Sequence, residues 1–190
     1  MQKRQLLYHL KPPTLSAFEM VKGVNAANGG LSISLLSNGT VVNIDNLGIS
    51  ATQYAIPTMS IGTWYHVAVV RNSSNQETVF VNGTRSSTGI VSDTNNYKVS
   101  SFIGAWNSGG LGPEAFFQGL ISNARVVIGS NVYDPTQTTI TVPTAPFTAV
   151  TNRQLLLNTT NDSNFLKDGS VNNYTMTNVN GVVASSLNPF

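Results

Sequence analysis

The stretch that decides the fold is Gly62-Thr63-Trp64-Tyr65-His66-Val67-Ala68-Val69-Val70-Arg71. Successive side chains of an extended strand point to opposite faces, so this stretch has two alternating sets of side chains. One set includes Trp64 and Val70, the other includes Val67 and Val69, and both sets are largely apolar. A strand with two apolar faces is typical of the interior of a sheet that is covered on both sides. The stretch therefore predicts a central β-strand.

Asn-Gly pairs mark three predicted hairpin turns, at Asn38-Gly39, Asn82-Gly83 and Asn180-Gly181. A two-residue type I′ turn needs positive φ at both central positions, and Asn and Gly tolerate that conformation best. β-prone runs flank these turns at 31–35 and 41–44, at 78–81, and at 174–177 and 182–183. Each turn is therefore expected to connect antiparallel strands.

Further β-prone runs lie at 99–103, 117–128 and 154–157, while helical periodicity is weak. The best helical candidate, Leu15–Val21, ends quickly at Gly23. Many short strands separated by turn signals predict an all-β sandwich or barrel. A chain of 190 residues is long enough for one such domain with a sizeable core.

The composition is poor in charge. Only 9% of the residues are charged, against roughly 25% in a typical soluble domain, while 41% are hydrophobic. Polarity comes from Asn, Ser, Thr and Gly, which suits either sugar recognition or packing against neighbours in an assembly. Because the net charge is only +2 and no dense basic face is visible, we expect no nucleic-acid partner. The lack of cysteine excludes disulfides and thiolate metal sites, and no apolar run is long enough to predict a membrane span.

Three motifs occur in an order that resembles the laminin-G-like branch of the concanavalin A-like lectin/glucanase superfamily. They are Trp64-Tyr65-His66-Val67-Ala68, Phe80-Val81-Asn82-Gly83, and Phe117-Gln118-Gly119-Leu120-Ile121 continuing to Arg125-Val126. The resemblance covers roughly residues 31–127 and implies an all-β, two-sheet antiparallel jelly-roll sandwich. It also implies that His66 is a structural residue of its strand and not a catalyst.

The residues after this region are similar to the tails of such modules in virion proteins of marine bacteriophages. The similar stretches include Val142–Val150 and Asp168–Tyr174. This second resemblance implies a non-enzymatic virion structural or adhesion module at the particle surface, such as a capsid decoration protein or a tail or head fibre component. Its partners would be other virion proteins or copies of itself. The alternative is a carbohydrate-binding, lectin-like adhesion domain that recognises cell-surface glycan and is extracellular if not viral.

Candidate binding residues lie in predicted loops. Trp106 could stack on a sugar ring while Asn107 bonds the sugar hydroxyls, or Trp106 could simply plug the end of the sandwich. Several members of the superfamily bind calcium through loop oxygens, and the candidates for that ion here are Asp45, Asp93 and Asn95. Ordinary Asx turns are the alternative interpretation of these three residues. No other cofactor is expected.

The acidic residues do not match a glycosidase. The glucanase branch places paired carboxylates on one strand through a Glu-x-Asp-x-x-Glu pattern, whereas Glu19, Glu77 and Glu114 have no Asp two residues further on. We therefore expect no enzymatic activity, and we interpret Glu77 as a solvated charge at the edge of a sheet.

The first part of the chain departs from the superfamily pattern. Relatives begin with a longer strand segment, and only Phe18–Val21 stands in that place here. We interpret residues 1–22 as an N-terminal arm or a shortened first strand, and residues 23–190 as the sandwich with C-terminal edge strands.

Leu6, Leu7 and Tyr8 form an apolar anchor ahead of Pro12-Pro13. A missing opening strand would leave unpaired N–H and C=O groups at a sheet edge, and such edges invite pairing with another chain. We therefore predict that residues 1–15 are an assembly arm that reaches onto an adjacent subunit or the particle surface. The alternative is an arm folded back on its own domain.

Overall fold

The computed structural model describes residues 3–12, 18–23, 31–36, 39–46, 51–95, 101–105, 116–158 and 164–190. The regular structure in these ranges is β-structure, and they contain no α-helix and no helix that could span a bilayer. The strands are β1 (Arg4–Lys11), β2 (Phe18–Gly23), β3 (Leu31–Leu35), β4 (Val41–Asn46), β5 (Ala51–Ala55), β6 (Tyr65–Arg71), β7 (Gln76–Val81), β8 (Thr84–Arg85), β9 (Val91–Ser92), β10 (Ser101–Ile103), β11 (Leu120–Ile128) and β12 (Arg153–Leu157).

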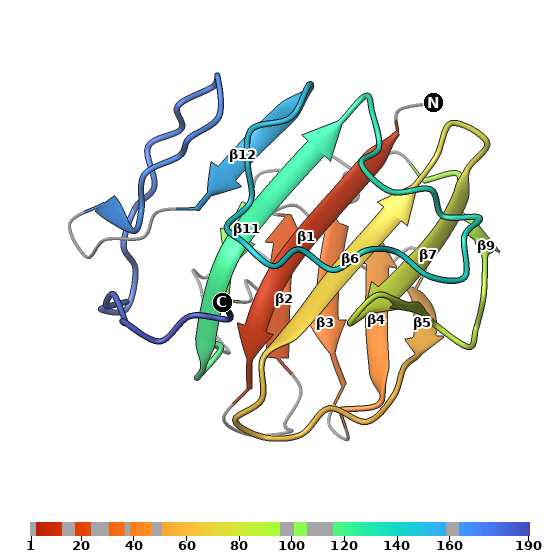
Figure 1. Cartoon of the computed structure of the whole chain (residues 1–190), viewed down its shortest axis with the longest axis horizontal. Coiled ribbons are helices and arrows are strands. Elements are labelled where there is room, and N and C mark those ends of the chain that lie inside the picture. Colours follow the sequence, from red (N-terminus) through yellow and green to blue (C-terminus); the bar gives the residue numbers. More distant parts are fainter. Residues whose placement is uncertain are drawn as a thin grey trace.

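The strands form two antiparallel sheets packed face to face (Figure 1). The seven-stranded sheet has the order β12-β11-β1-β6-β7-β8, and β9 also pairs with β7. The five-stranded sheet lies behind it in Figure 1 and has the order β10-β2-β3-β4-β5. The predicted all-β, two-sheet antiparallel jelly-roll sandwich is confirmed.

Strand β6 lies inside the seven-stranded sheet, between β1 and β7, as its two apolar faces predict. Val67 and Val69 are buried against the five-stranded sheet. Ala68 and Val70 lie on the opposite face and are also buried. Protein therefore covers both faces of this strand.

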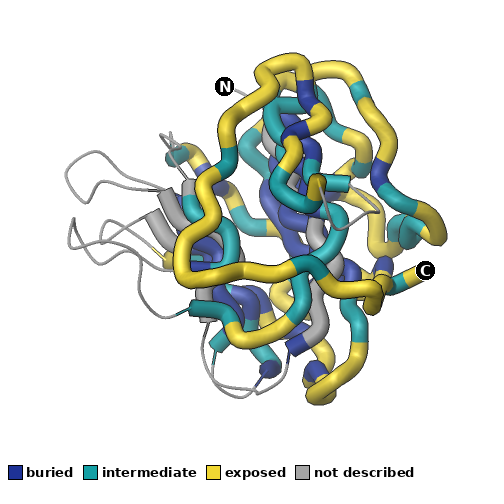
Figure 2. The backbone as a smooth tube through the Cα atoms, turned by 90° about the vertical axis from the view of Figure 1, so that its left-hand side faces the viewer, coloured by how far each residue is buried: buried dark blue, intermediate teal, exposed yellow. Residues whose placement is uncertain are grey.

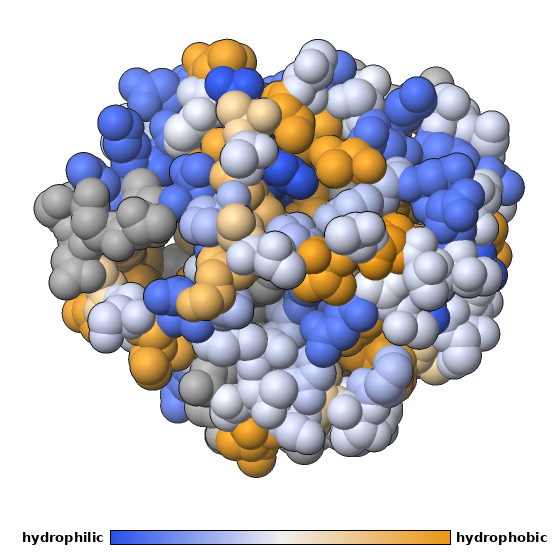
Figure 3. All heavy atoms as spheres, in the orientation of Figure 1, coloured by the Kyte–Doolittle hydropathy of each residue, from blue (hydrophilic) through white to orange (hydrophobic). Residues whose placement is uncertain are grey.

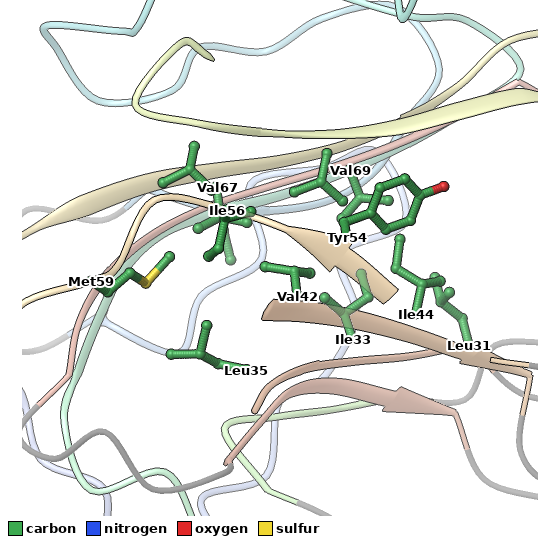
Figure 4. Packing of buried hydrophobic residues seen from close by; sticks show 13 residues of the cluster. Leu31, Ile33, Leu35, Val42, Ile44, Tyr54, Ile56, Met59, Val67 and Val69 are labelled. Atoms are coloured by element: carbon green, nitrogen blue, oxygen red, sulfur yellow. The ribbon is translucent and has the colours of Figure 1, made fainter. Parts of the chain in front are cut away.

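The core between the sheets is built from alternate side chains of both layers. Figure 4 shows Val67 and Val69 of one sheet meeting Val42 and Tyr54 of the other. The buried members of this core are Leu31, Ile33, Leu35, Val42, Ile44, Tyr54, Ile56, Met59, Val67, Val69, Val79, Val81 and Ala124. Full burial of one Val, Leu or Ile side chain contributes about 1.5–3 kcal/mol of transfer free energy, so this cluster is a major source of stability.

A second apolar cluster covers the outer face of the seven-stranded sheet. Residues 129–150, here called the strap, cross in front of β1 and β6 in Figure 1. In Figure 2 buried backbone lies at the centre of the domain and exposed backbone lies around it. The buried members of the cluster are Leu7, Ala68, Val70, Phe80, Phe147 and Leu156, and Tyr133 and Ile140 pack against them. The seven-stranded sheet is thus enclosed on both faces.

Backbone angles confirm the turn chemistry at Asn82-Gly83. The two φ angles are 47° and 82°, and β7 pairs back with β8 directly after the turn. Gly39, with a φ of 67°, lies between the paired strands β3 and β4. Its predicted turn partner, Asn38, lies outside the described residues.

The third predicted hairpin forms only its turn. Asn180-Gly181 has positive φ at both residues, but 174–177 and 182–183 form no strands, so that part of the prediction is wrong. The side chain of Asn178 accepts the N–H of Val182 and donates to its carbonyl oxygen. This side-chain bridge closes the loop without a backbone ladder.

The N-terminal strand corrects the predicted assembly arm. Leu6, Leu7 and Tyr8 lie in β1, which pairs with β11 on one side and with β6 on the other. Leu7 is fully buried in the cluster under the strap. Because both edges of β1 are already paired within the domain, the strand has no free edge for an adjacent subunit.

The best helical candidate of the sequence, Leu15–Val21, contains a strand where the chain is described. Phe18–Gly23 forms β2, which pairs with β3 and with β10. A register shift between Glu19 and Val21 lets the strand bend while it keeps pairing with β3. Pairing with these two distant strands overrides the weak local helical preference.

Short segments without strand structure cover the sheet edges. Residues 168–172 bond both the N–H and the C=O of Leu156 in edge strand β12. At the opposite edge, the strap accepts the backbone N–H of Arg85 in β8. In edge strand β5, Ala55 donates its N–H to the hydroxyl of Thr88. The chain itself therefore caps these edges, contrary to the open edge that we predicted.

Candidate functional site

The outer face of the five-stranded sheet is polar at its centre. In β3, Leu31, Ile33 and Leu35 point into the core, so Ser32 and Ser34 lie on the opposite face. Both serines are nevertheless buried, with exposed fractions of 3% and 6%. Small, enclosed hydroxyl groups thus form the centre of this face.

The pairing register surrounds these serines with polar positions. Residues directly opposite in antiparallel strands lie on the same face of a sheet, so two rows of positions cross from β2 to β5. Asn43 is half-buried and Gln53 is exposed. We call these positions the polar face, of which the first row is Glu19, Ser34, Asn43 and Gln53, and the second is Lys22, Ser32, Asp45 and, in β5, Ala51.

The polar face presents groups suited to a neutral, hydroxyl-rich ligand. Serine hydroxyls and carboxamides each donate and accept hydrogen bonds, as sugar hydroxyls do. Phe102 in β10 is the Cα partner of Lys22 and adds a half-buried aromatic position at one end of the second row. Small-molecule sites commonly combine aromatic side chains with a few placed polar groups.

The sugar-binding residues predicted from sequence, Trp106 and Asn107, lie outside the described residues. Of the predicted calcium ligands, Asp45 lies in β4 of the five-stranded sheet. Asp93 and Asn95 instead follow β9 of the seven-stranded sheet. Sequence reasoning did not find the polar face, although the Leu-Ser alternation at 31–35 was a visible signal of one polar side.

Asp93 binds an internal cation, the guanidinium of Arg71. Nη1 of Arg71 lies 2.7 Å from Oδ2 of Asp93 and donates to the carbonyl oxygen of Asn95 at 2.7 Å. The backbone N–H and Nδ2 of Asn95 donate to the other carboxylate oxygen, Oδ1, at 2.9 and 2.7 Å. Both carboxylate oxygens therefore accept hydrogen bonds from the chain itself.

This arrangement does not fit calcium. A calcium ion takes six to eight oxygen ligands, usually including free carboxylates, whereas the carboxylate of Asp93 faces a buried guanidinium. Within the described ranges, no group of three or more His, Cys, Asp or Glu side chains could hold a metal ion. Asn95 makes the Asx-type contact with Asp93 that was the alternative interpretation of this loop.

Glu77 is buried, which corrects its interpretation as a solvated charge. It is 2% exposed and is the Cα partner of Arg71 across β6 and β7. The hydroxyl of Tyr54 donates to its Oε1 at 3.2 Å. Buried charges persist in proteins when they are paired and hydrogen-bonded, so Arg71, Glu77 and Asp93 form a structural polar cluster.

His66 lies under the strap. Its ring is 1% exposed and meets the rings of Tyr133 and Phe147 edge to face, with centroids 6.1 and 6.2 Å away. Its backbone N–H donates to Oδ1 of Asn82, which ties β6 to the hairpin turn. His9, the other histidine of the chain, is its Cα partner in β1. The ring contacts and burial of His66 are those of a structural residue.

Arg125 of β11 contacts the strap and holds it against the seven-stranded sheet. Its guanidinium carbon lies 4.8 Å from the centre of the Phe147 ring, and Nη1 donates to the carbonyl oxygen of Thr148 at 3.0 Å. Burial lowers the pKa of Arg125 and raises the pKa of Tyr133, while the charge interaction between the two groups opposes both shifts. Arg125 stays charged at any physiological pH, so the cation–π contact is permanent.

Asp168 anchors the C-terminal part of the chain, a function that the sequence analysis missed. Its carboxylate accepts the N–H groups of Leu156, Ser170 and Tyr174 at 2.8–2.9 Å and the hydroxyl of Ser170 at 2.7 Å. Burial alone would raise the pKa of Asp168, but these hydrogen bonds outweigh burial and lower it. The Asp-Gly-Ser turn sequence was the available signal.

Comparison with known families identifies the fold. The family model described as the concanavalin A-like lectin/glucanases superfamily matches residues 10–129. The chain belongs to this superfamily. No curated protein matches it.

Solved structures of the same fold are distant in sequence. A heptameric SAP-like pentraxin from Limulus polyphemus is 19% identical, with 65% of this chain and 63% of that chain covered and a TM-score of 0.52. Domains LG4-5 of the mouse laminin alpha1 chain are 12% identical, with coverage of 65% and 34% and a TM-score of 0.51. A Trypanosoma rangeli sialidase is 15% identical, with coverage of 70% and 21% and a TM-score of 0.50. At these identities the likeness shows the fold alone.

Three buried carboxylates, those of Glu77, Asp93 and Asp168, do not suit the glucanase chemistry of the superfamily. Hydrolysis needs two carboxyl groups facing one glycosidic bond, either about 5–5.5 Å or about 6.5–9.5 Å apart. Glu77 accepts the Tyr54 hydroxyl, Asp93 pairs with Arg71, and the carboxylate of Asp168 is enclosed by backbone donors. Each of these three carboxylates therefore stabilises the fold.

Proposed function

We propose that this superfamily member is a non-enzymatic adhesion module that binds glycan through the polar face of its five-stranded sheet. The observation that carries the proposal is the row in which Ser34 is in register with the half-buried Asn43 of β4 and the exposed Gln53 of β5. The strap covers the corresponding outer face of the other sheet, so the two sides of the sandwich differ.

The chemistry of the polar face favours a neutral ligand over a charged one. Its two rows contain one basic and two acidic positions among hydroxyl and amide positions. A charged ligand would gain little Coulomb energy in water from a surface on which both signs of charge are mixed. Sugar hydroxyls, by contrast, can exchange hydrogen bonds with the carboxamides of Asn43 and Gln53, which offer both donor and acceptor atoms.

A glycan array with purified protein tests this proposal. The double variant Asn43→Ala/Gln53→Ala should weaken binding to any glycan recognised by the wild type at least tenfold. Gln137→Ala, an exposed site on the strap, is the matched control and should bind like the wild type. Binding should persist in a chelator, because Asp93 is occupied by Arg71. The absence of any glycan ligand, or equal binding by the double variant, contradicts the proposal.

The second candidate is a virion structural component, such as a capsid decoration protein or a fibre part. It is favoured by the resemblance of residues 142–150 and 168–174 to the tails of phage virion modules. The stretch after Asp168 is held against β12 through hydrogen bonds to Gln154 and Leu156 and so belongs to the folded domain. Its partners would be other virion proteins or copies of itself, at the particle surface.

Extraction from purified particles separates the two candidates. A structural component should leave the particle in denaturant but not in competing free sugar. Release by sugar alone would indicate a glycan-mediated attachment instead. In either case we expect no release of reducing sugar from β-glucans, and hydrolysis by the purified wild-type protein would refute a non-enzymatic function.

A further inference from the structure

Residues 169–190, here called the C-terminal segment, contain no charged residue, although the rest of the chain contains 18. The segment runs along the outside of the domain, at the left of Figure 1. Figure 3 shows apolar side chains distributed among polar ones over this face of the molecule. The exposed large apolar residues of the segment are Val171, Tyr174, Val179, Val182, Val183, Leu187 and Phe190.

The exposure of this segment is large for apolar side chains. Val171 is 77% exposed and Val183 is 81% exposed. Elsewhere in the described ranges, the exposed large apolar residues are only Ile61, Ile90 and Val132. Concentration of exposed apolar residues in one stretch marks an interaction site more often than scattered residues do.

The local backbone is already shaped for strand pairing. Asn180-Gly181 adopts positive φ at both residues, the conformation of a tight hairpin turn, and Asn178 holds the turn through Val182. The arms on either side nevertheless form no ladder. The anchor at Asp168 fixes where the segment leaves the domain.

We propose that residues 174–187 pair with the same segment of a second copy of this chain. In a two-fold interface residue i of one copy meets residue j of the other and j meets i, so any charge in the segment would be brought twice into the same small interface. The C-terminal segment avoids that repulsion because it has no charges. Seven of the ten exposed large apolar residues in the described ranges also lie in this segment, so a second copy supplies apolar side chains to meet them. This inference is independent of glycan binding.

Sedimentation of the full chain over a range of concentrations tests the proposal. The wild type should be dimeric, and Val182→Lys/Val183→Lys should have half that mass, because four lysines would then be brought into an uncharged interface without partners of opposite charge. Ile61→Lys, on another part of the surface and 59% exposed, is the control and should stay dimeric. All three proteins should melt at similar temperatures at concentrations low enough for the wild type to be monomeric, since the substituted side chains are solvent-exposed in the single chain.

Three results would overturn the proposal: a wild type that is monomeric at every concentration, a double-lysine variant that stays dimeric, or an Ile61→Lys control that dissociates equally. Glycan binding of the double-lysine monomer, measured per chain, should equal that of the wild type. Dimer formation and glycan recognition can therefore fail separately.

Discussion

Leu7→Ala tests whether the first strand belongs to the core. Leu7 is fully buried between the strap and the seven-stranded sheet, and its strand pairs on both sides. The substitution removes three carbon atoms, which at about 0.8 kcal/mol per buried methylene gives a transfer loss of about 2.4 kcal/mol. The cavity that remains raises the expected loss in unfolding free energy to about 2.5–5 kcal/mol.

Urea unfolding followed by far-ultraviolet circular dichroism measures this loss. A domain usually has about 5–15 kcal/mol of stability, so the variant should unfold at clearly lower urea. The melting temperature should fall by about 5–20 °C, at roughly 2–4 °C per kcal/mol for a chain of this size. Leu187→Ala is the matched control, because Leu187 is 58% exposed and should change stability by less than about 0.5 kcal/mol.

Equal stability of Leu7→Ala and Leu187→Ala would refute the reasoning, because it would mean that residues near Leu7 form a free arm. If Leu7→Ala does not fold, Leu7→Val provides a milder test. That variant removes one methylene and should lose about 1 kcal/mol.

Three other predictions concern a turn, a buried ion pair and an anchor. Gly83→Ala should lower the melting temperature more than Gly89→Ala. Both glycines have φ near +80°, but only at Gly83 would the added Cβ lie 2.6 Å from a carbonyl oxygen of the strap. Equal falls in melting temperature would argue against that packing. Arg71→Met should lower the unfolding free energy by about 3–5 kcal/mol, because it leaves Asp93 buried without its cation, and a loss under about 1 kcal/mol in urea unfolding would contradict the pairing. Folding lowers the pKa of Asp168, so the stabilisation of the fold by this carboxylate is complete above the unfolded pKa of about 3.9 and is lost as the pH falls through the lower folded pKa. Asp168→Asn should therefore have a lower unfolding free energy than the wild type at pH 7, and the difference between the two proteins should shrink in acid.

Local signals predicted the strands and the turns well. Predicting the central strand from the alternation at 62–71 requires only the two-residue period of a strand, and predicting the turn at Asn82-Gly83 requires only the φ preferences of these two residues. The position of β1 could not be predicted in the same way, because its partners Ala68 and Arg125 are remote in sequence from Leu7. An apolar run at the start of a chain has the same local pattern whether it lies in a core or on an arm.

The candidate site was harder to predict than the fold. The alternation at Leu31–Leu35 shows that Ser32 and Ser34 share a face, but their neighbours Asn43 and Gln53 follow only from the strand register. For Asp93, the sequence showed an acidic loop residue but not the cation that Arg71 supplies from a different strand. Register and long-range ion pairs depend on tertiary structure, which no local pattern encodes.

The central place of β1 has a consequence for how the protein is made. During synthesis β1 emerges before both of its neighbours, and its second neighbour is complete only when Ile128 has been added. Such distant pairings slow folding, and unpaired apolar strands on a nascent chain are prone to aggregate. The yield of soluble protein should therefore rise when translation is slowed by cooling or when a chaperone shields Leu6–Tyr8 until the rest of the sheet arrives.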